Sequence, residues 1–285
     1  MTSNGWSRTV PAPIKITLTG AQETRLATLY GRSEDAAGPQ PILGDKWARQ
    51  VVDNIDYDFA KLGMDAAACV GVAVRASLLD RWTSEFLSTH PSATVLHLAC
   101  GLDTRGLRVQ HGTGVRWIDV DLPDVVSLRR KLIPNPEGDY TLMAASVTKI
   151  EEWIDKIPTD RPLIVVLEGL TMYLRPEEGR RLFETIVKRF SGAGGQLVFD
   201  AYGTIGIRLQ SIVKPVKNTG STLYWGIDDG KVLEEWCPGL KVVDEFRSCE
   251  MPGLQKLAFA TRMQLWVMSW VPYLRDFGRM LRYQF

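Results

Sequence analysis

Cysteine, histidine and net charge are all scarce in this 285-residue chain, and each scarcity narrows the possibilities. The four cysteines form no CxxC pair, and none of the three histidines stands at metal-ligand spacing, so we expect neither a zinc site nor disulfide bonds. Basic residues number 34 and acidic residues 33, without the basic excess by which nucleic-acid binders neutralise phosphates. We therefore predict no metal and no nucleic-acid partner.

Long apolar runs are also missing. The nearest candidate, residues 266–271, is bracketed by Arg262 and Arg275 and is too short to cross a bilayer. Residues 1–6 lack the basic start and apolar core of a secretory signal. Hydrophobic residues still make up 45% of the chain, which is enough for a sizeable core. We expect a soluble, cytoplasmic protein without a membrane partner, and its oligomeric state stays open.

No repeat, low-complexity tract or linker divides the chain, so we expect one domain. The first ninety residues have helical apolar spacing. A helix over 23–30 ends before the turn residues 38–41, and Asp45 can cap a second helix that continues through 51–55. A third helix is predicted over 66–90, with a proline just beyond it.

From Ala93 the pattern changes to short apolar runs separated by longer amphipathic segments. Continuous runs of Val, Ile and Leu indicate strands covered on both faces, and parallel neighbours need crossover helices such as residues 176–189. The sequence therefore predicts a doubly wound α/β sheet. The expected strands are 94–99, 115–120, 140–143, 163–167, 196–199, 240–246 and 280–285, with further helices at 123–130, 231–236 and 255–277.

A glycine and two acids follow the first two of these strands. Gly101 stands where a missing Cβ would let a ligand approach the backbone, although a plain turn is the alternative. Twenty residues later the second strand ends in Asp119 and Asp121, an offset at which an acid can bind both hydroxyls of a ribose. Both side chains lie on one side of an extended strand, so the pattern does not choose between them. Capping of the next helix by Asp121 or Asp124 is the alternative.

Three further polar residues interrupt apolar surroundings. Ser146 follows a short strand, where its hydroxyl could bond an adenine edge or belong to a turn. Glu168 ends a very apolar strand, where a carboxylate is costly unless a cation satisfies it, either the sulfonium of S-adenosylmethionine or a salt-bridge partner. Arg75 needs a carboxylate, and Asp80 lies at an awkward helical offset. The carboxylate of the same cofactor is the sharper expectation for Arg75.

With these residues assembled, five motifs in order can be compared with known families: Ile16-Thr-Leu-Thr-Gly-Ala-Gln-Glu-Thr24, Ile55-Asp-Tyr-Asp-Phe59, Gly101-Leu-Asp-Thr-Arg105, Asp119-Val-Asp-Leu-Pro-Asp124 and Glu168-Gly-Leu-Thr-Met-Tyr-Leu174. Through them the sequence resembles the leucine carboxyl methyltransferase family, and most of all its branch of tetracenomycin-type polyketide O-methyltransferases. The resemblance implies a Rossmann-like class I methyltransferase with a mostly parallel sheet and an antiparallel last strand. Within one domain it implies a helical lid at 1–92, a cofactor-binding core at 93–202, and a substrate cap with the final strands at 203–285.

The family uses S-adenosylmethionine and releases S-adenosylhomocysteine, so the same cofactor and product are implied here. The sequence departs from the family at two positions. Ala99 stands where family members frequently have glycine, and Ser146 stands where members that methylate proteins have an Asp-Leu pair. By position, the family implies Arg75 and more loosely Lys15 at the cofactor carboxylate, Gly101 beneath its methionine part, Asp121 (with Asp119 as neighbour) at the ribose, Ser146 at the adenine and Glu168 near the amino group.

Methyl transfer mainly requires that acceptor and methyl be aligned in a dry site. The polar groups expected nearest the methyl are Tyr173, Asp200 and Tyr202, and the three histidines are expected to be structural. We therefore expect an acceptor oxygen that needs little deprotonation, on a small-molecule carboxylate or hydroxyl. Its pocket is expected to use aromatic walls: Tyr224, Trp225, Trp236, Trp266 and Trp270. Aromatic residues at helical spacing are usually core, however, and Trp266 and Trp270 could also serve dimer packing.

Three other functions stay open at this point. A protein carboxyl methyltransferase would act on a partner's C-terminal carboxylate. A nicotinamide-dependent oxidoreductase would share the ribose acid, but Gly101 and Gly106 are five apart and form no GxGxxG motif. A non-methylating protein could retain S-adenosylmethionine only as a scaffold.

Overall fold

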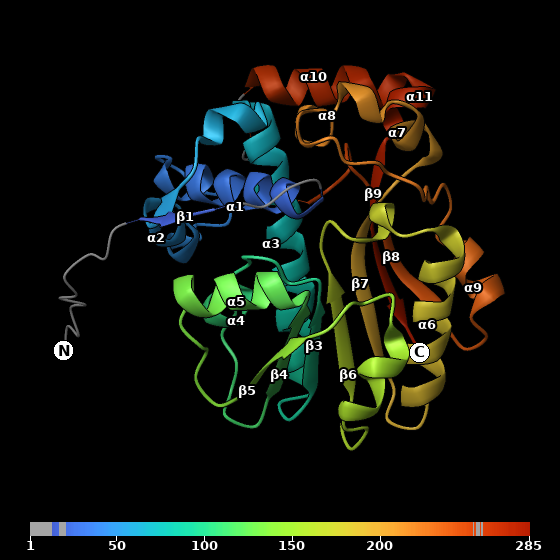
Figure 1. Cartoon of the computed structure of the whole chain (residues 1–285). Helices are drawn as coiled ribbons and strands as arrows, with labels where there is room; N and C mark the ends of the chain where they lie inside the picture. Colours follow the sequence, from blue (N-terminus) through green and yellow to red (C-terminus); the bar gives the residue numbers. More distant parts are fainter. Residues whose placement is uncertain (1–12, 17–20, 253, 255–256, 258) are drawn as a thin grey trace.

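A seven-stranded sheet lies at the centre of the computed structural model, which describes residues 13–16, 21–252, 254, 257 and 259–285 (Figure 1). Its order is β5-β4-β3-β6-β7-β9-β8. The first five of these strands are parallel neighbours, and β9 runs antiparallel to both β7 and β8. This confirms the predicted doubly wound sheet with an antiparallel last strand. The strands are β3 (Thr94–Leu98), β4 (Arg116–Asp121), β5 (Asp139–Ala144), β6 (Leu163–Leu167), β7 (Gly195–Tyr202), β8 (Lys241–Arg247) and β9 (Gly278–Gln284).

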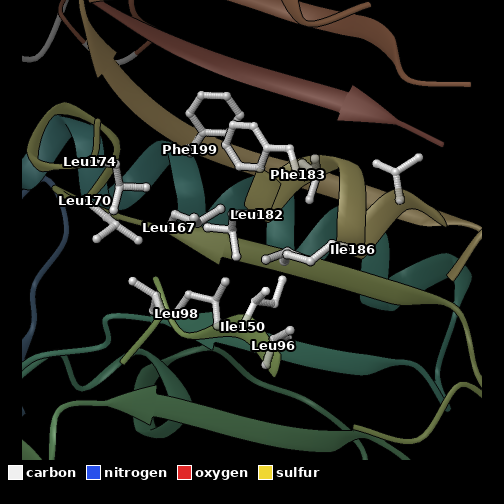
Figure 2. Packing of buried hydrophobic residues seen from close by; sticks show 14 of the residues in the cluster. Leu96, Leu98, Ile150, Leu167, Leu170, Leu174, Leu182, Phe183, Ile186 and Phe199 are labelled. Atoms are coloured by element: carbon white, nitrogen blue, oxygen red, sulfur yellow. The ribbon is translucent and has the colours of Figure 1, made fainter. Parts of the chain in front are cut away.

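The central strands are buried on both faces, which explains their unbroken apolar sequences. Alternate residues of β3 point to opposite sides, so Leu96 and Leu98 pack in one cluster and Val95 packs in another. Figure 2 shows the first cluster, in which Leu182 and Ile186 of helix α6 (Pro176–Phe190) lie against the sheet. The second face is covered by the C-terminal half of the long helix α3 (Ala66–Thr89).

The topology places a crevice at the carboxyl ends of β3 and β6. From β3 the chain moves outward to β4 and β5, then returns across the sheet to pair β6 with the other side of β3. Ligands of open α/β sheets bind at such a switch point. The connections are α4 (Arg105–Arg108), α5 (Pro123–Leu132), the 3-10 turns η2 (Ile150–Glu152), η3 (Ile154–Lys156) and η4 (Thr171–Tyr173), and helix α6.

The N-terminal helices pack over the loop that follows β3. Their apolar side chains, among them Leu26, Leu29 and Val51, form a cluster with Leu102 and Ile133. The elements are β1 (Ile14–Lys15), α1 (Ala21–Ala37), α2 (Lys46–Asp53), β2 (Ile55–Asp56), η1 (Phe59–Leu62) and α3.

Local sequence signals in this region largely hold. The side chain of Asp45 accepts a hydrogen bond from the N–H of Ala48, as a helix cap should, and α3 begins at Ala66 as predicted. Ile55 was expected in the second helix but pairs with Ile14 in a short parallel ladder instead. Residues 17–20 of the first family motif lie outside the described part of the chain.

The C-terminal third adds a cap above the carboxyl edge of the sheet (Figure 1). The expected helix at 255–277 is two helices, because Pro272 begins a new one, and residues 255–256 and 258 are not among those described. Within the described ranges, no helix is both long and apolar enough to cross a membrane. The elements of the cap are α7 (Thr204–Arg208), η5 (Gln210–Ile212), α8 (Lys214–Thr219), α10 (Phe259–Trp270) and α11 (Pro272–Arg275). Helix α9 (Lys231–Trp236) lies beside α6 and β8 at the flank of the sheet instead (Figure 1).

Candidate active site

The loop after β3 turns sharply through two residues with left-handed backbones. Ala99 has φ of 51° and Gly101 has φ of 53°. Glycine adopts this conformation without strain, whereas an alanine is strained in it. The resemblance predicts glycine at position 99, and the backbone there has the shape that glycine favours. The turn points the N–H of Gly101 at Asp121, whose carboxylate accepts it at 2.7 Å.

The structure separates the two acids of β4. Asp121 is buried at the strand tip, where it accepts hydrogen bonds from the backbone N–H groups of Gly101 and Leu122, each at 2.7 Å. Asp119 is fully buried and accepts from Arg129 at 2.6 Å and from the Tyr140 hydroxyl at 2.8 Å. The pattern left the choice open, and only Asp121 faces the glycine loop.

Asp119 belongs to an internal ion pair. Burial raises its pKa, but Arg129 and His97 outweigh burial and lower the pKa to about 2. Its side chain also accepts from the indole N–H of Trp117 at 2.9 Å. These donors account for its charge without a ligand. The helix-capping alternative for Asp121 is not what the structure has, because Leu122 occupies the cap position of α5.

Arg75 lies between two carboxylates. Its guanidinium contacts Glu168 at 3.1 Å and Asp200 at 3.0 Å, and these three residues come from α3, the end of β6 and β7. The sequence predicted that a bound ligand would supply the carboxylate partner of Arg75. In the structure, two carboxylates of the protein itself, those of Glu168 and Asp200, pair with Arg75. Asp80, which stood at an awkward offset, instead pairs with Arg105 at 2.6 Å.

Glu168 lies within ion-pair distance of three arginines, Arg75, Arg105 and Arg32, the last with 3.8 Å between its terminal nitrogen and the carboxylate. Arg105 donates to its second oxygen at 2.6 Å. Burial raises the pKa of Glu168, but Arg75 and Arg105 lower it to about 2, so the carboxylate is ionised at neutral pH. Burial raises the pKa of Asp200, which Arg75 and the N–H of Gly169 oppose. Arginines thus balance the charge of the buried Glu168. This is the salt-bridge alternative that the sequence left open.

A cavity of about 590 Å³ opens beside this cluster. Arg75, Glu168 and Asp200 line one part of it, and Tyr173 and Tyr202 line another. The hydroxyl of Tyr173 donates to Thr24 at 3.1 Å. Burial raises the pKa of both tyrosines, that of Tyr202 to about 12. The apolar walls come from the N-terminal helices, the sheet and the cap, and include Met64, Val70, Met172, Val216, Leu223, Leu257, Leu265, Phe277 and Met280.

Other predicted site residues lie outside the lining of this cavity. Gly101 and Asp121 lie beside it, next to Arg25, which does line it. Ser146 is half-buried after β5, with its hydroxyl 2.9 Å from that of Thr148. Lys15 is exposed on β1. The structure thus brings Arg75, Glu168 and Asp200 into contact and leaves Ser146 and Lys15 apart from them.

The prediction that five aromatic residues form the acceptor walls was wrong, because none of them lines the cavity. Trp225 is buried and stacks on Trp236 with 6.0 Å between ring centroids. It fits against Gly179 of α6, where a Cβ would stand only 2.0 Å from its ring. Trp266 and Trp270 are 57% and 72% exposed. Tyr224, nearly half exposed, lies instead beneath the guanidinium of Arg175.

Two residues near the site were missed from the sequence. Arg25 of α1 donates to Asp121 at 2.8 Å, across 96 positions of the chain. Arg105 bridges Asp80 and Glu168 from within a family motif. Neither pairing leaves a local sequence signal, because each depends on elements that the fold brings together. Among the described residues, no cluster of three His, Cys, Asp or Glu could hold a metal ion.

Strand order 5-4-3-6-7-9-8, with a glycine loop and an acid at the carboxyl edge, defines the Rossmann-like class I methyltransferase fold. Solved structures share it. A duf574 family protein of Streptomyces avermitilis superposes with a TM-score of 0.61 at 12% identity, over 93% of this chain and 97% of that one. An S-adenosylmethionine-dependent methyltransferase of Mesorhizobium loti gives 0.50 at 13% identity, over 73% and 98%.

Sequence comparison identifies the family. Residues 27–187 match the leucine carboxyl methyltransferase family, to which the chain belongs. It is 41% identical to the tetracenomycin polyketide synthesis O-methyltransferase TcmP of Streptomyces glaucescens, over 95% of this chain and 98% of that protein. It is also 41% identical to the S-adenosyl-L-methionine-dependent methyltransferase dpfgK of Gibberella zeae, over 80% and 82%. The chain is therefore an S-adenosylmethionine-dependent methyltransferase, as the sequence predicted.

The residues at the edge of the sheet fit this cofactor. A bare backbone at Gly101 stands beside the carboxylate of Asp121, a pairing suited to a nucleoside with two ribose hydroxyls. The ionised carboxylate of Glu168 suits an ammonium group, and the guanidinium of Arg25 suits a carboxylate. Arg75 borders the same cavity, where Glu168 and Asp200 already pair with it. When bound, the cofactor supplies an electrophilic methyl group on a sulfonium.

Proposed function

We propose that the enzyme methylates an oxygen, a carboxylate or an acidic hydroxyl, on a largely apolar small molecule of secondary metabolism. The name of one relative at 41% identity supports the class of acceptor, since TcmP is a tetracenomycin polyketide synthesis O-methyltransferase. The observation that carries the proposal is the cavity of about 590 Å³, which joins the Arg75 cluster to apolar walls. Its volume falls in the range of small-molecule sites.

The proposed cofactor site runs along the carboxyl edge of the sheet. Gly101 lies beneath the methionine part and Asp121 binds the ribose, while Ser146 approaches the adenine. Glu168 faces the amino group, and Arg75 lies at the carboxylate end. Lys15 remains a weaker candidate because its side chain is exposed on β1. Asp119 is left out, since Arg129 and Tyr140 already use its carboxylate.

The chain's own contribution to the reaction is alignment and exclusion of water. Methionine and aliphatic side chains surround the acceptor, among them Met172, Leu223 and Met280. Fixing the acceptor oxygen in line with the methyl group lowers the barrier by roughly 7–11 kcal/mol in favourable cases. Flexible methionines can pack against acceptors of irregular shape.

The two tyrosines beside the acceptor are protonated at neutral pH and cannot accept a proton from it. The pKa of Tyr202 is raised to about 12, and that of Tyr173 is raised as well, so both are protonated donors. The two oxygens of Asp200 accept from Arg75 and from the N–H of Gly169. We propose that the acceptor enters as an anion and that Tyr173 and Tyr202 orient it, with Asp200 fixing Arg75.

Methyl transfer to matched acceptors tests the proposal. The enzyme is incubated with S-adenosylmethionine and a panel of aromatic polyketides bearing a carboxylate or an acidic phenol, and with a peptide ending in a free carboxylate. We expect methyl esters or ethers of panel members by mass spectrometry. Methylation of the peptide alone would favour the protein-directed alternative. Binding without transfer to any acceptor would favour a non-methylating protein.

The remaining expectations concern the setting of the enzyme. The four cysteines are free thiols, which supports work in a reducing compartment such as the cytoplasm. We also propose that the single domain is divided into a lid at 1–92, a cofactor-binding core at 93–202 and a substrate cap at 203–285. The N-terminal helices and the C-terminal cap both line the cavity, with Thr24 and Leu265 as examples.

A further inference from the structure

Arg25 occupies the position that the proposed site gives to the ribose. Its terminal nitrogen donates to Asp121 at 2.8 Å. Its side chain passes over Gly101, where a Cβ would stand 3.3 Å from the Cδ of Arg25. With the N–H groups of Gly101 and Leu122, this contact engages both oxygens of Asp121. These three donors leave about one acceptor site on the carboxylate, on Oδ2, which is too few for two ribose hydroxyls. Both hydroxyls can therefore bind Asp121 only if Arg25 moves aside.

After leaving Asp121, the Arg25 guanidinium can pair with another carboxylate in the cavity. It lines the same cavity as Arg75 and Glu168, and its side chain is 22% exposed. Asp121 is its one carboxylate partner among the described residues. Once a ribose takes Asp121, a guanidinium left in this partly buried place is costly unless a second carboxylate pairs with it.

Arg75, by contrast, is already neutralised. Glu168 and Asp200 contact it at 3.1 and 3.0 Å, and those two acids lie almost entirely out of solvent. A ligand carboxylate beside this cluster would add a third negative charge next to two existing ones. A guanidinium that arrives from α1 removes that repulsion.

We propose that Arg25 exchanges partners when the cofactor binds, leaving Asp121 to the ribose and pairing with the carboxylate of the methionine part. The inference rests on the proposed cofactor site and names a residue that both competes with and recognises the cofactor. Because Arg25 belongs to α1, the exchange also couples cofactor binding to the helices that cover the cavity. Two opposite effects on affinity follow.

Two ligands that differ only in the carboxylate separate these effects. S-adenosylhomocysteine carries it, and 5′-deoxy-5′-(3-aminopropylthio)adenosine lacks it while keeping the adenosine and the amine. Dissociation constants for both are measured by isothermal titration calorimetry on the full chain and on Arg25→Met. Arg49→Met, a change of an exposed arginine on α2, is the matched control.

The variant should bind the decarboxylated ligand about threefold more tightly, the scale of a partly exposed ion pair that no longer competes. The preference for S-adenosylhomocysteine over the decarboxylated ligand should fall by about tenfold, the scale of one charge-assisted hydrogen bond. Arg25→Lys should keep much of that preference, and Arg49→Met should keep all of it.

An unchanged preference in Arg25→Met, with near-native circular dichroism, would overturn the exchange. Weaker binding of both ligands by the same factor would do so too, because it would make Arg25 a structural support. Failure of the unmodified protein to bind either ligand is a different result. It would reject the proposed cofactor site itself.

Discussion

The backbone N–H of Gly101 donates a 2.7 Å hydrogen bond to the carboxylate of Asp121. The bond ties the loop after β3 to the tip of β4, so the protein itself fixes the spacing between the two parts of the proposed nucleoside site. The contact depends on a left-handed backbone at Gly101, with φ of 53°. Such preorganisation lets a ligand bind without first ordering the groups that hold it.

The two acids of β4 should separate by function when each is changed to asparagine. Asp121→Asn should weaken S-adenosylhomocysteine binding by at least about tenfold while the fold is kept. Asp119→Asn should leave the affinity near native but reduce the free energy of unfolding by about 3 kcal/mol, because Arg129 loses its buried counter-ion. Calorimetric titration and urea unfolding measure the two effects. A reversed pattern would mean that Asp119 is the ribose acid.

Stability should fall steeply in acid. The pKa of Glu168 is lowered from 4.5 to about 2, and that of Asp119 from 3.8 to about 2. Between about pH 4.5 and 2 the unfolded chain binds more protons than the folded one, so the free energy of unfolding decreases as pH falls through that window. Glu168 contributes to this loss because Arg75 and Arg105 stabilise its buried carboxylate in the ionised form.

Urea unfolding at a series of pH values checks this, with Glu168→Gln as the control. The variant should be less stable at neutral pH, since Arg75 and Arg105 keep their charge. It should also lose part of the acid dependence. An identical pH slope in both proteins would show that folding does not lower the pKa of Glu168.

Ala99→Gly should stabilise the enzyme. Its φ of 51° is strained for alanine, and glycine relieves about 1 kcal/mol of that strain, offset in part by greater freedom in the unfolded chain. The same change at Ala73, inside α3, should be destabilising by about 1 kcal/mol or more, because glycine is a poor helix former. The midpoints of thermal unfolding compare the two. Destabilisation by both changes would argue against strain at Ala99.

The tryptophans should divide into core and surface. Trp225→Ala should lower the free energy of unfolding by about 3–5 kcal/mol, as for other fully buried aromatic residues. Trp266→Ala and Trp270→Ala should leave the KM for the acceptor unchanged, because these side chains are exposed and do not line the cavity. A raised KM in either surface variant would restore the sequence prediction of an aromatic acceptor wall.

What the sequence predicted well is what local patterns determine. The strand over 163–167 and the helix over 231–236 begin and end where apolar spacing placed them, and α3 begins at the predicted Ala66. The sheet topology followed from buried strands that need crossover helices. The order of the motifs along the chain predicted that the glycine loop follows β3 and that the acids end the next strand, β4.

What the sequence could not resolve depends on contacts between distant residues. Asp119 and Asp121 share one side of β4 in any strand pattern, and only Arg129 and Tyr140 show which acid is already paired. Arg25 meets Asp121 because α1 packs over the loop after β3. From the sequence, Trp225 was expected to line the acceptor pocket. Only its close packing against Gly179 of α6 shows that it belongs to the core.

In the proposed site, one nucleoside lies at the carboxyl edge of β3 and β4 and is bound by Asp121. A crystal structure of the enzyme with S-adenosylhomocysteine tests it most directly. We expect both ribose hydroxyls within hydrogen-bonding distance of the Asp121 carboxylate, and the sulfur facing the cavity that Tyr173 and Tyr202 line. A ribose bound elsewhere, with Arg25 still on Asp121, would contradict it.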